Sequence, residues 1–362
     1  MQLSTKVFAI AAALAAFTAP TLSAQTSAPQ TAEQVYKNIT ELKGTPADQL
    51  GPAMNFISSS LGVECNFCHV QGKMDADDKP AKKTAREMIA MTNEINKSAF
   101  KGQRQVTCYS CHNGKGHPAS MPPVMESDAA PKPPAPPAPA AGSAPAAPTA
   151  PTADQIVEKY VAALGGADAL KKVTSRSMQG MIVTNGNESA IELLAKAPNK
   201  RISISKMGTG ESMTAFDGTA GWMGSTGRPA RAMSETESDA AGLDAEFALA
   251  LRLKELFPQL RRGRPDTING TAVEVLTGMR QGKPPVRLYF DQNTGLLLRM
   301  VRYAETSMGR MPTQIDYADY RTVDGIKVAC KWTLSRPNGR FTIQIKDVKQ
   351  NVAIDDAKFA KQ

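Results

Sequence analysis

A run of proline and alanine in the middle of the chain constrains its fold more than any other feature. Residues 126–153 contain repeated prolines, as in the segment PKPPAPP at residues 131–137. Such a segment favours extended polyproline conformations and lacks the apolar side chains of a core, so it acts as a semi-rigid spacer. A length of 362 residues also exceeds the roughly 100–200 residues of one domain. We therefore expect two separately folded domains, residues 25–125 and 154–362.

The first 24 residues have the pattern of an export signal. Lys6 supplies the positive charge, residues 7–19 the apolar stretch and residues 22–24 a small-residue cleavage site. No later stretch approaches the roughly 18 apolar residues of a membrane span. We expect a soluble protein exported to the periplasm, with Gln25 at its mature start.

The N-terminal part has a helical pattern over residues 31–117. Apolar spacing predicts a first helix near residues 35–42, a second from residue 46 or 47 to 61 with Thr45 as its N-cap, and a third over residues 81–96. The first helix has one face with Val35, Ile39 and Leu42. The expected inner face of the second is Leu50, Met54, Ile57 and Leu61, and the third has one stripe with Ala85, Met88, Met91, Thr92 and Ile95.

The C-terminal part has a mixed pattern. A helix is expected over residues 153–173, interrupted at Gly165 and Gly166, and another over residues 244–256. Strands are expected at residues 177–184, 189–195, 200–206, 212–216, 219–223, 271–277, 286–291, 296–303, 313–320, 326–335 and 340–348. Short strands in series, separated by turns such as Asp324-Gly325, predict a curved antiparallel sheet, a half-open barrel, with helices covering it.

Two motifs carry chemistry, CNFCH at residues 65–69 and CYSCH at residues 108–112. Each is the attachment sequence of a c-type haem. Two cysteines at this spacing reach the two vinyl groups of one porphyrin, and the adjacent histidine binds the iron as the proximal ligand. The predicted attachment residues are Cys65, Cys68, Cys108 and Cys111, and the predicted proximal ligands are His69 and His112.

A zinc site or a redox-active cysteine pair could also use Cys-x-x-Cys. Neither explains why His follows both pairs in a chain with only three histidines. We therefore expect two covalent haems and their iron. A methionine is the first candidate for the opposite ligand, because a thioether stabilises ferrous iron. Met54 precedes Cys65 on the second expected helix, where it could also be an ordinary core residue.

The blocks MNFISSSLGVECNFCH at residues 54–69, TAREMIAM at 84–91 and VTCYSCHNG at 106–114 resemble the cytochrome c subunit of photosynthetic reaction centres. The resemblance covers residues 30–120. It implies a dihaem cytochrome c domain in which Met54 is the distal ligand of the first haem. That family has four haems and this chain has two motifs, so the resemblance is to a short, two-haem relative.

The distal ligand of the second haem stays open. Met91 ranks first and Met88 second, since both lie on the helix before Cys108. One haem of the four-haem family is bound by two histidines, which makes His117 the third candidate. His117 lies only five residues beyond His112, so it would not easily reach the opposite face of the same haem.

The C-terminal part is similar in pattern to the half-open barrels of periplasmic lipoprotein carriers, which implies an apolar ligand or a docking role. It contains no histidine, which removes the commonest general base. Cys330 is expected to be a buried apolar side chain.

The formal net charge of +9 is dispersed, so it predicts a solvated surface, and nucleic acid is not an expected partner.

We expect an electron-transfer protein, not an enzyme, which passes single electrons between redox partner proteins, one of which could be a membrane-bound complex. Two alternatives stay open: a peroxidase-like haem enzyme with one open iron position, and a carrier of an apolar ligand with a redox-sensing haem domain. The sequence does not identify the electron donor or acceptor.

Overall fold

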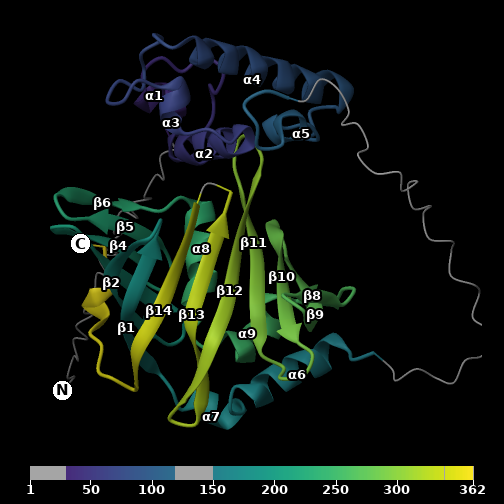
Figure 1. The fold of residues 1–362 in the computed structure, drawn as a ribbon, viewed down its shortest axis with the longest axis vertical. Coiled ribbons are helices and arrows are strands. Elements are labelled where there is room, and N and C mark those ends of the chain that lie inside the picture. The colour runs from purple at the N-terminus through teal and green to yellow at the C-terminus, as the bar shows by residue number, and fades with distance from the viewer. Residues whose placement is uncertain (1–29, 119–149, 338, 362) are drawn as a thin grey trace, which may run out of the picture.

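The computed structural model describes residues 30–118, 150–337 and 339–361. The first of these ranges is helical, and the later ranges form a sheet with helices packed on it (Figure 1). The predicted signal peptide and residues 126–149 of the predicted linker lie outside the described residues.

The helical region contains short helices around one long one. Its elements are α1 (Ala32–Val35), the 3₁₀ turn η1 (Ala47–Gln49), α2 (Leu50–Leu61), α3 (Cys65–Cys68), α4 (Pro80–Ala99) and α5 (Cys108–His112). The prediction of a helix near residues 35–42 is wrong. Asn38 has a left-handed φ of 60°, which a right-handed helix cannot accommodate. Leu42 is nevertheless buried, so the apolar pattern indicated burial rather than a helix.

The second predicted helix is present as η1 followed by α2. Thr45 does not cap it, because no side-chain cap is made at the start of η1. Gly62 ends α2 with a left-handed φ of 66°. A Cβ atom on Gly62 would lie 2.1 Å from the carbonyl oxygen of Gly114, so glycine is required there both for the turn and for the close approach.

The inward face of α2 differs from the predicted one. The buried side chains are Ala53, Phe56 and Ser60, whereas Met54 is half-buried. The backbone N–H of Gly114 donates to the carbonyl oxygen of Ser60 at 2.9 Å. This contact places Ser60 against the segment after α5. Of the predicted face, Leu50, Met54 and Ile57 are partly buried and pack against the cluster that contains Ala53 and Phe56.

The third predicted helix is α4, which starts with Pro80 at its first turn, a position where proline costs no hydrogen bond. The stripe predicted for this helix is only partly buried, because the exposed fractions of Met88 and Met91 are 38% and 45%. Thr92, a member of the predicted stripe, and Asn96, which is not, are both buried and bond to nearby backbone groups. The buried face of α4 is Lys82, Ile89, Thr92 and Asn96.

The C-terminal region starts with α6 (Ala153–Ala163) and α7 (Ala167–Lys171), which confirms the predicted helix and its break. The remaining elements are β1 (Ser175–Thr184), β2 (Asn187–Lys196), β3 (Lys200–Met207), β4 (Gly210–Phe216), β5 (Gly221–Ser225), β6 (Arg228–Ala232), α8 (Glu235–Ala245), α9 (Leu249–Leu256), β7 (Gln259–Arg262), β8 (Asp266–Ile268), β9 (Thr271–Arg280), β10 (Lys283–Asp291), β11 (Leu297–Glu305), β12 (Arg310–Val323), β13 (Ile326–Arg336), β14 (Gly339–Gln350) and the 3₁₀ turn η2 (Asp356–Lys358).

The strands of the described ranges form one 14-stranded sheet in the order β6-β5-β4-β3-β2-β1-β14-β13-β12-β11-β10-β9-β7, with β8 beside β9. Two antiparallel meanders, one from β1 to β6 and the other from β9 to β14, join where β1 pairs with β14. The end strands β6 and β7 do not pair with each other. The sheet is therefore antiparallel and open, as predicted, rather than a closed barrel.

Helices α6, α8 and α9 pack on this sheet (Figure 1). Their main core joins Tyr160 of α6 and Leu253 of α9 to Leu288 and Phe290 of β10. The helix predicted over residues 244–256 is present as α9, which begins later, at Leu249, and ends at Leu256 as predicted. Helix α8, which ends at Ala245, was not predicted. Strands β6, β7 and β8 were also not predicted.

Helix α8 has no apolar stripe, which is why apolar spacing did not reveal it. Its start does carry a local signal. The Ser234 hydroxyl accepts from the N–H of Glu237 at 3.3 Å, and the Glu237 carboxylate accepts from the N–H of Ser234 at 2.9 Å. This capping box could have identified α8 from the Ser-x-x-Glu spacing.

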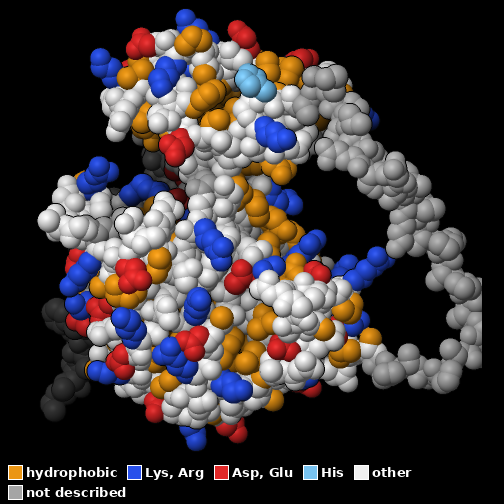
Figure 2. Space-filling view, in the orientation of Figure 1, with side chains coloured by type: hydrophobic (Ala, Val, Ile, Leu, Met, Phe, Trp, Pro, Cys, Tyr) orange, Lys and Arg blue, Asp and Glu red, His pale blue; other side chains and the backbone are white. Residues whose placement is uncertain are grey.

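Acidic and basic side chains are interspersed over the face drawn in Figure 2, as expected for a dispersed net charge. Among the described helices, none is both long enough and apolar enough to span a bilayer.

Candidate haem sites

The first motif begins a short helix and ends at an ordered histidine. Cys65 and Cys68 are the first and last residues of α3, and His69 is its C-cap. The Nδ1 atom of His69 lies 2.8 Å from the carbonyl oxygen of Met74. A carbonyl oxygen can only accept, so Nδ1 carries the proton and Nε2 keeps its lone pair. This arrangement prepares Nε2 to bind a metal.

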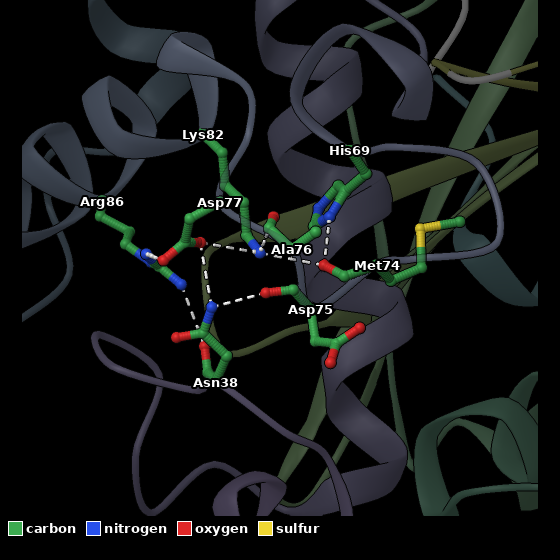
Figure 3. A network of polar contacts seen from close by, with 8 residues as sticks. All are labelled: Asn38, His69, Met74, Asp75, Ala76, Asp77, Lys82 and Arg86. Carbon is green, nitrogen blue, oxygen red and sulfur yellow. Dashed lines mark hydrogen bonds and ion pairs between the residues drawn. The ribbon is translucent and has the colours of Figure 1, made fainter.

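A polar network holds the loop that carries this carbonyl group (Figure 3). The Nζ atom of Lys82 donates to the carbonyl oxygens of Met74 at 3.0 Å and Ala76 at 2.8 Å. Lys82 is buried on α4, so the loop after His69 is tied to the long helix. The ring of His69 is therefore oriented by a backbone atom whose own position is fixed.

Asp77 lies at the centre of the same network. Hydrogen bonds from Arg86 and Asn38 hold the pKa of its carboxyl well below its usual range, and an ion pair with Lys82 at 3.2 Å contributes. Arg86 also donates to the carbonyl oxygen of Asn38 at 3.0 Å. The segment before α2, the loop after His69 and α4 are thus joined at one point.

An open cavity of about 710 Å³ lies beside the first motif, within the size range of small-molecule and cofactor sites. Cys65 and His69 line it from α3, and Asn55 and Ser59 line it from α2. Pro337, in the turn after β13, lines it from the C-terminal region. Two potential haem-binding side chains of the motif, those of Cys65 and His69, therefore line the same cavity.

The second motif repeats this arrangement on α5. The Nδ1 atom of His112 lies 2.9 Å from the carbonyl oxygen of Lys115, so Nε2 of His112 is again the free ring nitrogen. Asn113, directly after the motif, has a left-handed φ of 49°, which turns the chain back toward the ring. The two histidines thus make the same ring contact with a backbone carbonyl oxygen, although their loops differ.

Asn96 positions the second motif, and sequence reasoning missed it. Its Oδ1 atom accepts from the backbone N–H groups of Gln105 and Val106, both at 2.9 Å. Its Nδ2 atom donates to the carbonyl oxygen of Val106 at 2.7 Å. A buried asparagine on a helix must find such partners, so its place on α4 was the available signal.

The predicted distal methionines lie on separate helices. Met54 on α2 is half-buried and packs against a cluster that includes Leu42 and Phe56. Met91 and Met88 on α4 are exposed, and His117 is exposed after α5. The role of Met54, Met91 or Met88 as a distal ligand of a haem iron therefore stays a prediction.

The donor set fits haem better than a bare metal ion. Among the residues that the structure describes, no group of three or more His, Cys, Asp or Glu side chains is placed to hold a metal ion, whereas a structural zinc site needs four such ligands. Each motif offers two sulfur atoms and one oriented imidazole, the set required for two thioether bonds and one iron ligand. The residues present therefore fit covalent haem. Cys330 of β13, by contrast, is fully buried in the sheet, as predicted.

Comparison with known proteins identifies the relatives of the helical part. Residues 3–155 match the family of the photosynthetic reaction centre cytochrome C subunit. The resemblance predicted from the motifs is thereby confirmed. Among curated proteins, the reaction centre cytochrome c subunit of Thermochromatium tepidum is 31% identical over 91 residues, covering 24% of this chain and 22% of that protein.

The reaction centre cytochrome c subunit of Roseobacter denitrificans is 29% identical over 112 residues, which cover 27% of this chain and 30% of that protein. The matched segment thus spans less than a third of either relative.

Two solved structures overlap the C-terminal part. A LolA superfamily protein from Nitrosomonas europaea is 13% identical with a TM-score of 0.42, covering 59% of this chain and 99% of that chain. A putative outer membrane lipoprotein-sorting protein domain from Vibrio parahaemolyticus is 11% identical with a TM-score of 0.41, covering 58% and 96%. The fold assignment rests on the strand order described above and not on these distant likenesses.

Proposed function

We propose that this protein is a two-haem c-type cytochrome that transfers single electrons. Cys65 and Cys68 would hold the first haem, and His69 would be its proximal ligand. Cys108 and Cys111 would hold the second, with His112 as its proximal ligand. When bound, a haem iron supplies a one-electron couple between its ferrous and ferric states.

One observation carries this proposal. In both motifs the histidine follows two cysteines, and its Nδ1 atom bonds to a backbone carbonyl oxygen, at 2.8 Å in His69 and 2.9 Å in His112. Both rings therefore present Nε2 in a fixed orientation. A structural histidine has no need of two adjacent cysteines, and the same arrangement occurs twice.

We further propose Met54 as the distal ligand of the first haem and Met91 as that of the second. Two methionine ligands would give six-coordinate irons, which suits electron transfer because the iron keeps the same ligands in both redox states. The similarity to reaction centre subunits also supports a membrane-bound electron-transfer complex as the partner. Export to the periplasm and the division into residues 25–125, 126–153 and 154–362 belong to the same proposal.

The test uses the full chain expressed in a host that matures cytochromes c. Intact mass and haem absorbance should give two haems per chain for the unaltered protein. The double variants Cys65→Ser with Cys68→Ser, and Cys108→Ser with Cys111→Ser, should each retain one. Cys330→Ser is the matched control and should retain two. A chain without covalent haem would overturn the proposal.

A second measurement separates electron transfer from haem enzymology. The ferrous protein should not bind carbon monoxide rapidly, because both distal positions are filled. Rapid binding at a native iron would instead favour the peroxidase-like alternative.

A further inference from the structure

The hairpin between β11 and β12 extends from the sheet to the helical region (Figure 1). The tip of this hairpin, residues 306–309, is held in shape by the side chain of Thr306. The Thr306 hydroxyl donates to the carbonyl oxygen of Gly309 at 2.6 Å and accepts from the N–H groups of Met308 and Gly309 at 3.2 and 3.0 Å. The tip is therefore a closed turn that presents Met308 in one orientation.

This hairpin tip is buried, although hairpin turns normally lie at the surface. Met308 is only 4% exposed and shares one apolar cluster with Ala53 and Phe56 of α2 and Ile89 of α4. A Cβ atom on Gly309 would lie 2.3 Å from Cζ of Phe56, so the ring lies directly on the hairpin backbone. The core of the helical region is thus completed by a residue from the sheet.

A polar contact fixes the same junction. The Nη1 atom of Arg104 donates to the carbonyl oxygen of Thr306 at 2.8 Å. Arg104 lies in the segment between α4 and α5, four residues before Cys108, and Cys108 packs against the same apolar cluster. The hairpin tip therefore contacts the surroundings of both motifs, α2 before the first and the segment before the second.

Helix α2 lies between this tip and the cavity at the first motif. Phe56 contacts the tip, whereas Asn55 and Ser59 line the cavity. Met54, two residues before Phe56 on the same helix, packs against the same apolar cluster as Phe56 and Met308. A shift of the tip would move α2, and with it the sulfur atom of Met54.

We propose that Met308 and Gly309 are positioning residues for the first haem, because their packing on Phe56 sets the place of α2 and hence of Met54. This inference rests on the proposed function. It gives the C-terminal region a role inside the electron-transfer unit: the sheet controls the coordination, and thus the reduction potential, of a haem bound by the helical region. Pro337, at the wall of the same cavity, makes a second contact from the sheet.

The experiment uses the full-length haem-loaded protein. The readouts are the absorption band of methionine bound to ferric iron and the midpoint potential of each haem. Met308→Ala and Gly309→Ala should reduce the band by about half, the share of one of two haems, and should lower the potential of the first haem with two haems still attached. Met308→Leu should behave as the unaltered protein, as should Met279→Ala, which replaces a methionine that is 39% exposed on β9.

Two further variants keep the inference testable if the first ones fold poorly. Arg104→Met removes the hydrogen bond to Thr306, together with one positive charge, and should shift the potential in the same direction by less. Phe56→Leu combined with Gly309→Ala relieves the contact with the ring and should restore the band. An unchanged band and unchanged potentials in Met308→Ala and Gly309→Ala, with both haems present, would overturn the inference alone. Absence of haem from the unaltered protein would overturn the proposed function instead.

Discussion

The Nδ1 atom of His69 and the Nζ atom of Lys82 both point at the carbonyl oxygen of Met74, at 2.8 and 3.0 Å. One backbone atom therefore couples the proposed iron ligand to the long helix α4. A histidine ligand is commonly oriented by its second ring nitrogen in this way. Lys82 extends this arrangement, because it fixes the carbonyl group of Met74, which in turn orients the ring of His69.

We expect Lys82→Met to destabilise the folded protein. The substitution keeps the apolar stem but leaves the carbonyl oxygen of Ala76 without its donor, and a hydrogen bond to a charged group is worth about 1.5–3 kcal/mol. The free energy of unfolding should fall by about that amount in chemical denaturation. Lys83→Met, at the exposed neighbouring position, is the matched control and should have little effect. Equal losses in both variants would contradict the role given to Lys82.

The carboxyl of Asp77 predicts how this network depends on pH. Its hydrogen bonds lower its pKa from the ordinary value of 3.8, so the folded state is stabilised when the carboxyl is ionised. That stabilisation is fully present above the ordinary pKa of the unfolded carboxyl and disappears as the pH falls through the lowered pKa of the folded one. The stability deficit of Asp77→Asn should therefore be largest near neutrality and shrink below about pH 4. Acid titration of both proteins, followed by the free energy of unfolding, measures this difference. A deficit that stays constant from pH 7 to pH 3 would argue against an ionised Asp77 in the network.

The local part of this architecture could be predicted from sequence. The Cys-x-x-Cys-His spacing identified both motifs, and Gly62 correctly ended α2, because both signals depend only on neighbouring residues. Most strands were predicted for the same reason, since alternation and turn residues are short-range features.

The long-range part could not be predicted. Nothing near Met308 indicates that it packs on Phe56, because the two residues are brought together only by the fold of the whole chain. Likewise, the burial of Asn96 and Lys82 on α4 depends on loops that follow no periodic pattern. Apolar spacing favoured a helix through Asn38, but its backbone is left-handed there. Its side-chain amide donates to the carboxylate of Asp77, a contact that no periodic pattern indicates.

Asn96→Ala should weaken the second site selectively. The change removes three hydrogen bonds to the segment before Cys108, and each buried group left unpaired costs about 1–3 kcal/mol. We expect partial loss of the second haem, so that the haem content falls from two toward one per chain. Haem absorbance combined with intact mass checks this. Asn93→Ala, at an exposed position of the same helix α4, serves as the control and should retain two haems. Full haem content in Asn96→Ala would show that the segment holds its place without this side chain.

Met54→Ala and Met91→Ala test the proposed distal ligands directly. Each should remove about half of the absorption band of methionine bound to ferric iron, because one of two haems loses its thioether ligand. Each should also lower the reduction potential of that haem, since a thioether stabilises ferrous iron. Met88→Ala is the matched control on α4, with an exposed fraction of 38% against 45% for Met91. If Met88→Ala rather than Met91→Ala abolished the second half of the band, the second ligand would be Met88. If none of the three altered the spectrum, the irons would take their distal ligands from other residues.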